Sequence, residues 1–308
     1  MKTRFYQDNS ESMPCDKVNL RRRYFLKLLA GSGLMISPLL AGSLAFANAN
    51  ANTNGMAKVK PNVKPGIQLY TVRDLMLQDV RSSLQLLAEL GYQELEFAGL
   101  FDRPAARIAS WLTELELSAP SGHVMLQPLL HDTNQVLAEA HTLGHRYLVM
   151  PYLSEHERSE GLLSYQKLAE QLNRIGEQCQ AAGITLAYHN HDFEFAVFDN
   201  TRPYDILLSQ TDARLVKMEI DFYWAAKMQV DVPALFQRYP GRFPLWHMKD
   251  MTADGNFADL GKGTIDFGPV VAAAGIAGLQ HAFVERDNTD NLDLTLQQGI
   301  RGFKKIFI

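Results

Sequence analysis

The sequence predicts an α/β protein whose single domain folds as a (β/α)8 barrel, and two observations lead to this fold class. Short apolar runs of β type alternate eight times with longer stretches in which apolar residues recur at helical spacing. The runs start about 25 to 40 residues apart, which is the length of a strand with its connecting helix. Such alternation predicts a parallel sheet, and eight units in about 240 residues are typical of the closed barrel, the TIM barrel.

The expected strands follow one another along the chain from residue 65 onward. They cover residues 66–72, 94–98, 118–124, 147–151, 184–189, 216–221, 244–249 and 282–286. Helices are expected between them over residues 80–90, 105–115, 133–143 and 162–182, and several of these stretches are followed by glycine. The alternative is an open doubly wound sheet, but no Gly-x-Gly-x-x-Gly motif follows any of the runs.

The first 47 residues have the pattern of an export signal and not of a barrel element. Arginines at positions 21–23 precede Tyr-Phe-Leu-Lys and a weakly apolar run that ends at Ala47. Paired arginines followed by Phe-Leu-Lys are typical of a twin-arginine signal, and Ala-Phe-Ala fits a processing site. We therefore expect cleavage after Ala47, passage through the twin-arginine export machinery and a periplasmic location. The alternative, an uncleaved membrane anchor, is disfavoured by the glycine and proline in the run.

The remaining chain divides into a polar linker over residues 48–64 and the barrel over residues 65–308. Cleavage removes seven basic and three acidic residues, so the 30 Lys+Arg and 34 Asp+Glu of the whole chain become 23 and 31. The resulting net charge of −8 lacks the basic excess that polyanion binding needs, so nucleic acid is not an expected partner. Cys179 is the only cysteine left, which excludes an intrachain disulfide. The oligomeric state stays open.

Four consecutive strands, from the fifth to the eighth, carry common metal ligands at their ends. One inward-facing residue from each gives the set His189, Asp221, His247 and Glu285. Active sites of this fold lie at the C-terminal ends of the strands, where these side chains would meet. Mixed imidazole and carboxylate ligands suit one divalent Mn, Co, Zn, Fe or Mg ion, and the sequence does not choose among them. The alternative is an ion-pair network that closes this end of the barrel.

Three motifs carry a resemblance to a known family: GIQLYTVRD over residues 66–74, YHNHDFEF over 188–195 and WHMKD over 246–250. Together they resemble the xylose-isomerase-like TIM-barrel superfamily, and within it the sugar phosphate isomerase/epimerase group, over residues 65–308. The resemblance implies metal ligands at Asp221, His247 and Glu285. The fifth-strand ligand is commonly Glu in this superfamily, whereas His189 stands here and His191 competes for the role. This departure argues against a symmetrical epimerisation by two metal-bound glutamates.

The chemistry that the resemblance implies is removal of a proton next to a carbonyl group, with the metal stabilising the enediolate. Glu285 is the first candidate for the base, and His191 is the alternative because its unperturbed pKa lies near neutrality. Glu96 is expected to face the metal as an acid or hydroxyl binder. Lys249 is expected to hold the developing oxyanion, or else to form a salt bridge with Asp250 or Glu219. The residues expected to line the substrate pocket are Gln68, Tyr70, His123 and Trp224.

The expected substrate is a small-molecule carbohydrate. Export favours free sugars or oxidised glycosides over sugar phosphates, and no clear phosphate loop stands out near Gly261-Lys262-Gly263. An isomerase or epimerase is the first expectation. The alternatives are a lyase or hydratase that acts on 3-keto-glycosides by the same proton removal, and a periplasmic carbohydrate-binding barrel without catalysis.

Overall fold

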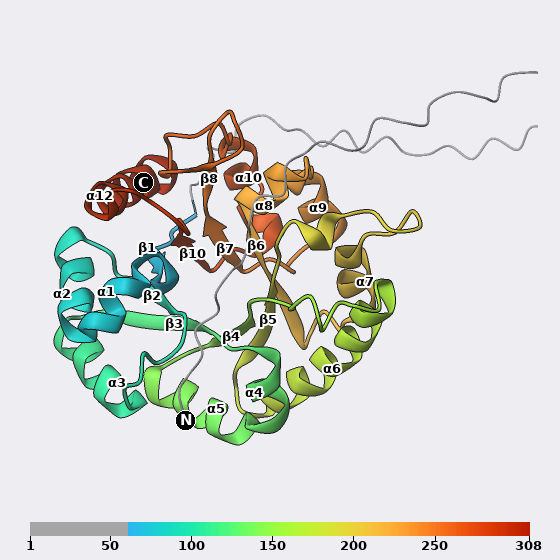
Figure 1. Cartoon of the computed structure of the whole chain (residues 1–308), viewed down its shortest axis with the longest axis horizontal. Helices are drawn as coiled ribbons and strands as arrows, with labels where there is room; N and C mark the ends of the chain where they lie inside the picture. Colours follow the sequence, from blue (N-terminus) through green and yellow to red (C-terminus); the bar gives the residue numbers. More distant parts are fainter. Residues whose placement is uncertain (1–60) are drawn as a thin grey trace, which may run out of the picture. The chain divides into compact units, whose positions relative to one another are not determined.

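Eight parallel strands close into a barrel in the computed structural model, which describes residues 61–308 of the chain (Figure 1). Around the barrel each strand pairs with its sequence neighbours, and the pairing of Gly66 with Phe283 closes the circle. The predicted (β/α)8 barrel is therefore confirmed. The strands are β1 (Pro65–Gln68), β2 (Glu94–Phe97), β3 (Ser118–His123), β4 (Tyr147–Met150), β5 (Thr185–His189), β6 (Val216–Asp221), β7 (Leu245–Met248) and β10 (His281–Val284).

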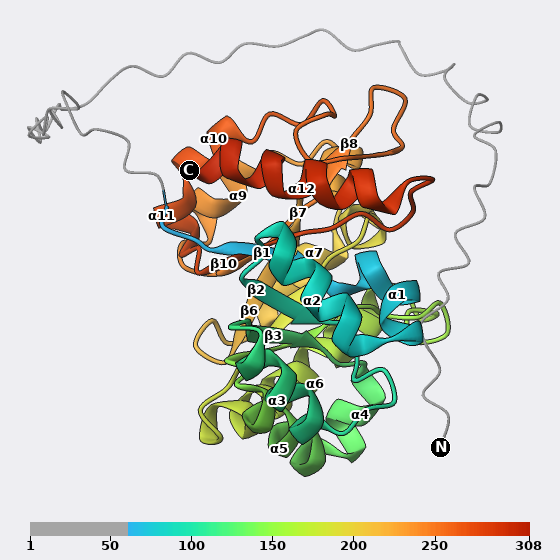
Figure 2. The same cartoon turned by 90° about the vertical axis from the view of Figure 1, so that its left-hand side faces the viewer.

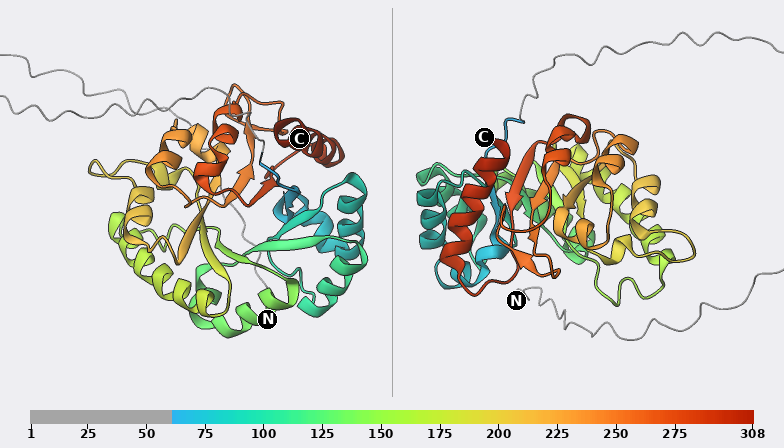
Figure 3. Two further views of the ribbon diagram at one scale, coloured as in Figure 1. Left: turned by 180° about the vertical axis from the view of Figure 1, so that it is seen from behind. Right: turned by 90° about the horizontal axis from the view of Figure 1, so that it is seen from above.

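Helices form the outer layer, and Figure 2 shows α12, α2 and α3 next to one another outside the first strands. The same outer layer is seen from behind and from above in Figure 3. The helices are α1 (Arg73–Gln78), α2 (Val80–Leu90), α3 (Ala105–Glu114), α4 (Leu126–His131), α5 (Thr133–Leu143), α6 (Leu162–Ala181), α7 (Pro203–Gln210), α8 (Phe222–Lys227), α9 (Val232–Arg238), α10 (Gly268–Ala272), α11 (Ala274–Ala277) and α12 (Leu292–Phe307).

The sequence of α2 shows why such a helix forms where it does. The Asp79 side chain caps its first turn by accepting a hydrogen bond from the Ser82 N–H at 3.1 Å. Leu84 and Leu87 lie fully buried on the face turned to the barrel. Gly91 ends the helix in the left-handed region, with φ of 96°, which an L side chain adopts only with strain.

Strand alternation separates the barrel interior from the layer between strands and helices. Val149, Ala187, Leu245 and Phe283 form a fully buried cluster that fills the interior below the strand ends. Trp246, one residue after Leu245, stacks instead on a phenylalanine of α9 in the outer layer. The next inward-facing residue of β7 is His247, so the apolar cluster supports the polar side chains at the C-terminal ends of the strands.

Two local features differ from the sequence prediction. The first strand ends at Gln68, and residues expected to extend it form the 3-10 helix η1 (Leu69–Val72). The Gln68 side chain accepts a hydrogen bond from the Tyr70 N–H at 3.0 Å, which turns the chain. After β7, the antiparallel hairpin of β8 (Asp250–Met251) and β9 (Phe257–Ala258) was not predicted.

The predicted signal peptide over residues 1–47, and the linker up to residue 60, lie outside the described residues. Within residues 61–308, no helix combines the length and the apolar character needed to span a membrane.

Candidate functional site

The four predicted metal positions lie together at the C-terminal end of the barrel. Asp221 ends β6, His247 pairs with it in register on β7, and Glu285 directly follows β10. His247 Nδ1 lies 2.9 Å from Glu285 Oε2 and 3.9 Å from Asp221 Oδ2. His189, at the end of β5, has its Nε2 at 3.9 Å from the same Asp221 oxygen. We call Asp221, Glu285, Lys249 and Asp287 the outer cluster, since they lie nearest the strand ends.

The donor atoms of Asp221, His247 and Glu285 fit a divalent cation. All three side chains are buried, and their ligand atoms lie within 4.8 Å of one another. Asp221 Oδ1 accepts a hydrogen bond from the Trp224 N–H at 3.1 Å, but the buried Oδ2 has no hydrogen-bond partner among the described residues. Burial raises the pKa of Asp221 to about 7, which Lys249 offsets only in part. A buried carboxylate oxygen without a hydrogen bond, beside an imidazole nitrogen, is a suitable cation ligand.

Lys249 carries the positive charge of the outer cluster. Its Nζ lies 2.5 Å from Asp287 Oδ1, 3.3 Å from Glu285 Oε2 and 3.6 Å from Asp221 Oδ2, so its partners are these carboxylates. Burial alone would lower the pKa of Lys249, but the three carboxylates raise it above its ordinary value. The rings of Trp224 and Phe257 flank the ammonium group at 5.1 and 5.0 Å. Lys249 therefore stays protonated and can hold an anion but cannot act as a base.

Asp250, which was considered as a salt-bridge partner of Lys249, points into the loop that follows β9 instead. Its carboxylate accepts hydrogen bonds from the N–H groups of Gly261, Gly263 and Ile265 at 2.9 to 3.2 Å. The backbone donors of this glycine-containing loop are thus bound to an internal carboxylate. This arrangement is the opposite of a loop that offers its N–H groups to a phosphate.

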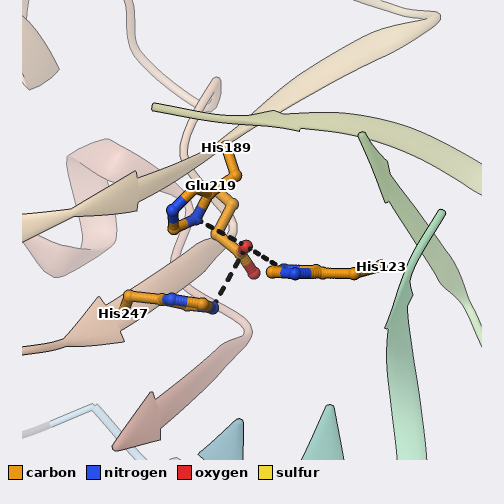
Figure 4. Close-up of side chains that lie close together, drawn as sticks. All are labelled: His123, His189, Glu219 and His247. Atoms are coloured by element: carbon orange, nitrogen blue, oxygen red, sulfur yellow. Dashed lines mark hydrogen bonds and ion pairs between the residues drawn. The ribbon is translucent and has the colours of Figure 1, made fainter. Parts of the chain in front are cut away.

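A second group of side chains lies deeper in the barrel and centres on Glu219 (Figure 4). Its Oε2 lies 2.9 Å from His123 Nε2, 3.0 Å from His189 Nδ1 and 3.1 Å from His247 Nε2. Burial alone would lower the pKa of His123, but Glu96 and Glu219 raise it to about 9. Sequence reasoning did not select Glu219 as a site residue. The available signal was its spacing of two from Asp221, which puts both carboxylates on the inner face of β6.

Glu96 and Gln68 belong to the same deep group, which we call the inner cluster: Gln68, Glu96, His123 and Glu219. Glu96 Oε2 lies 2.6 Å from His247 Nε2 and accepts a hydrogen bond from the Gln68 amide at 2.8 Å. Both side chains are fully buried. Glu96 thus contacts the His247 nitrogen that faces away from the outer cluster, a position from which a carboxylate orients a metal-binding imidazole. Gln68 in turn contacts Glu96.

His191 and Trp224 lie at the mouth of the barrel beside the outer cluster. The His191 ring stacks on Phe193, with centroids 5.4 Å apart, and packs against Trp224 at 5.3 Å. Burial and then the nearby Lys249 hold the pKa of His191 well below its usual range, so the imidazole is neutral. Its Nδ1 has no hydrogen-bond partner in the part of the chain that the structure describes. Tyr70, half-buried in η1, has a guanidinium over its ring at 4.2 Å.

Known proteins share this fold and part of its sequence. A family model described as a xylose isomerase-like TIM barrel matches residues 84–306. An inosose dehydratase of Clostridium beijerinckii is 27% identical over 124 residues, which cover 34% of this chain and only 41% of that protein. A sugar phosphate isomerase/epimerase structure from Parabacteroides distasonis has a TM-score of 0.65 at 24% identity, covering 80% of this chain and 96% of the other. The IolI protein with a bound zinc atom has a TM-score of 0.62 at 15% identity, covering 80% and 98%.

Proposed function

Because this chain belongs to the xylose isomerase-like TIM-barrel family, we propose that it is a divalent-metal-dependent enzyme of the isomerase/epimerase type. In this proposal it removes a proton next to a carbonyl group of a carbohydrate. The observation that carries the proposal is the convergence of Asp221, His247 and Glu285 at the strand ends, with one buried Asp221 oxygen lacking a hydrogen-bond partner among residues 61–308. Solved structures with the same fold include proteins named as a sugar phosphate isomerase/epimerase and as D-tagatose 3-epimerase-like, which supports the reaction class.

Asp221, His247 through Nδ1, and Glu285 would hold the ion, with His189 as the fourth ligand. When bound, a divalent ion supplies Lewis-acid stabilisation of the charge that develops on the carbonyl oxygen. The ammonium group of Lys249 lies within 3.6 Å of two of these ligands and adds a fixed positive charge beside that oxygen. The carboxylate of Glu96 keeps the His247 ring oriented.

His191 suits the role of base better than Glu285 does. Glu285 Oε2 is shared by His247 and Lys249, and although burial would raise the pKa of Glu285, these two groups hold it well below its usual range. Burial and then Lys249 hold the pKa of His191 below its usual range as well, so the pKa shifts do not separate the two residues. His191 differs because it lies at the mouth of the barrel and its Nδ1 has no hydrogen-bond partner among residues 61–308. We therefore assign proton removal to His191 and leave Glu285 as a ligand.

A dehydratase or lyase reaction is the second candidate, because it begins with the same proton removal and continues with loss of a neighbouring group. The relative named as an inosose dehydratase supports it, as does a group able to protonate a departing oxygen. With no ion bound to its ring, His123 is such a group, since its pKa of about 9 keeps it charged at neutral pH. A 3-keto-glycoside would be the corresponding substrate.

The substrate class also depends on where the protein works. The twin-arginine pattern at residues 21–27 supports export to the periplasm, where free sugars and oxidised glycosides are more available than sugar phosphates. The Asp250-bound loop at Gly261 and Gly263 further supports a substrate without phosphate. We propose a keto-sugar or keto-glycoside as substrate.

Hydrogen exchange tests the proposal directly. The protein, loaded with Mn²⁺, Co²⁺ or Zn²⁺, is incubated in D₂O with keto-sugars and 3-keto-glycosides, and loss of the C–H signal beside the ketone is followed by NMR. We expect exchange in the wild type, and at least a hundredfold slower exchange in Asp221→Asn and His191→Gln. The control is Asp212→Asn, which alters a surface carboxylate paired with Arg214. Sugar binding without exchange in any metal-loaded form would contradict catalysis and support a carbohydrate-binding barrel.

A further inference from the structure

Two imidazole rings at the centre of the barrel each face two different groups of carboxylates. His189 has Nδ1 at 3.0 Å from Glu219 and Nε2 at 3.9 Å from Asp221. His247 has Nε2 at 3.1 Å from Glu219 and Nδ1 at 2.9 Å from Glu285. Glu219 lies two residues before Asp221 on β6, so it occupies the next inward-facing layer below the outer cluster. The two rings therefore connect an outer and an inner set of possible ligands.

The inner set has the spacing of a metal site. One ligand atom from each of His123, His189, Glu219 and His247 can be chosen so that all four lie within 4.8 Å of one another. Ligand atoms around a single ion bound at about 2.0 to 2.2 Å are separated by at most about 4.4 Å, so small side-chain shifts are enough. Figure 4 shows the three rings pointing from three different strands toward the Glu219 carboxylate.

Glu219 also has a ligand atom to spare. Its Oε2 faces the three imidazoles, whereas its buried Oε1 has no hydrogen-bond partner among the residues that the structure describes. The outer cluster shows the same feature at Asp221 Oδ2. A buried carboxylate oxygen without a partner is costly, and a cation is the group that most directly satisfies it.

The charges of both clusters are compatible with a bound cation. The outer cluster has the carboxylates of Asp221, Glu285 and Asp287 against the single ammonium of Lys249, which leaves two negative charges. The inner cluster has Glu96 and Glu219, both fully buried, and their ion pairs within residues 61–308 involve histidines alone. Although burial would lower the pKa of His123 and His247, the facing carboxylates raise it, to about 9 for His123. In the metal-free protein, protonated histidines therefore balance the inner carboxylates, and a divalent cation bound there would take the place of these protons.

We propose that His123, His189, His247 and Glu219 bind a second divalent ion, one layer below the ion that the proposed function assigns to Asp221, His247 and Glu285. The inference rests on the proposed function in that the two sites share the rings of His189 and His247. A ring that binds both ions, one through each nitrogen, would do so as an imidazolate that has lost its N–H proton. Three imidazoles with a carboxylate favour Zn²⁺, Co²⁺, Fe²⁺ or Mn²⁺ over Mg²⁺ and Ca²⁺, which prefer oxygen ligands. The inner ion would fix the rings of His189 and His247 below the outer ion, and at His247 Nε2 it would take the place of the hydrogen bond to Glu96.

Metal stoichiometry tests the second site. The protein is stripped with chelator, titrated with Co²⁺ while its visible absorption is recorded, and assayed for bound cobalt after gel filtration. We expect two equivalents in the wild type, one in His123→Gln, which alters only the inner set, and one in Asp221→Asn, which alters only the outer set. The control His281→Gln changes a histidine that pairs with Glu94 at 2.6 Å at the start of β10, and should keep two equivalents.

The outcomes separate this inference from the proposed function. One equivalent in the wild type that is lost in Asp221→Asn and kept in His123→Gln would overturn the inner site and leave the proposed function intact. One equivalent lost in His123→Gln and kept in Asp221→Asn would support the inner site and contradict the outer, catalytic one. If His123→Gln does not fold, the wild type and Asp221→Asn decide, because a single saturating equivalent that Asp221→Asn loses overturns the inner site.

Discussion

Glu194 shows how one buried residue fixes the position of the proposed base. The fully buried carboxylate accepts hydrogen bonds from the Tyr188 hydroxyl at 2.5 Å and from the His191 N–H at 2.7 Å, and so holds the turn after β5. Burial raises the pKa of Glu194 to about 7, which these hydrogen bonds offset only in part. The folded protein thus keeps a proton between about pH 4.5 and 7 that the unfolded chain has lost, and this contribution to stability falls as pH rises through that range.

Glu194→Gln removes this titration while keeping one acceptor for His191 and one donor for Tyr188. We expect the unfolding free energy of the variant, relative to wild type, to increase by on the order of 3 kcal/mol between pH 4.5 and 7.5. Urea unfolding of the metal-free proteins at both pH values measures the difference. Parallel pH dependence of the two proteins would show that folding does not raise the pKa of Glu194.

At the residue scale, the sequence predicts which side chains reach the site better than it predicts their partners. Asp221, His247 and Glu285 could be selected because strand ends meet at one edge of a barrel and because the family resemblance implies ligands at these positions. For Glu219 the only signal was its spacing of two from Asp221, which gives the face of the strand but not the side chains opposite it. Lys249 pairs with Asp287, from the loop after β10, which local spacing does not reveal.

At the scale of elements, the β8–β9 hairpin and the loop after it form one unit held by Asp250. Gly263 is required there, because a Cβ on this residue would lie 2.3 Å from Asp250 Oδ1 and 2.4 Å from a backbone oxygen of β8. Phe257 of β9 covers the Lys249 ammonium group at 5.0 Å. A change that breaks the hydrogen bonds between the loop and Asp250 should therefore also disturb the packing of Phe257 on the Lys249 ammonium group.

Gly263→Ala is expected to destabilise the protein by roughly 1 to 3 kcal/mol through overpacking, and to lower turnover. Gly275→Ala is the matched control: the residue lies in α11 with nothing within 4 Å of an added Cβ, and its substitution should stabilise by about 0.5 to 1 kcal/mol. Thermal unfolding of both variants checks the pair. Equal stability of the two would show that the loop accommodates a side chain next to Asp250.

The end of β1 shows what element prediction misses. Residues 66–72 have the apolar pattern of a strand, yet the strand ends at Gln68, whose side chain hydrogen-bonds to the backbone two residues on. Whether the chain continues as a strand or turns here depends on the position of the Gln68 side chain. That position is fixed by a hydrogen bond that its amide donates to Glu96 of the neighbouring strand. The remaining strands are buried on both faces and are therefore largely apolar along their length. This apolar pattern is why their positions could be predicted.

At the scale of the whole molecule, the barrel is predictable because a unit of one strand followed by a helix recurs eight times. The number of these units and their spacing along the chain predict that the sheet closes into a barrel. The buried charges at its C-terminal end oppose folding unless they are compensated. Asp221 shows this most clearly: burial raises its pKa to about 7, so at pH 8 the metal-free protein holds an ionised carboxylate that is more stable in the unfolded chain. Metal binding would reverse this effect, because a ligand of the folded state stabilises it.

The order of stability of wild type and Asp221→Asn should therefore depend on metal. At pH 8 with chelator, we expect the variant to melt above the wild type, because the neutral amide avoids the cost of the buried charge. With Zn²⁺ or Co²⁺ at about 100 times its Kd, the wild type gains about 2.7 kcal/mol, or about 5 to 10 °C in Tm, and should melt above the variant. Differential scanning calorimetry with chelator and with metal measures whether the order of the two melting temperatures reverses. A wild type that melts above Asp221→Asn even with chelator would mean that protein groups alone compensate this carboxylate, since Lys249 and His247 are then the only cations near it within residues 61–308.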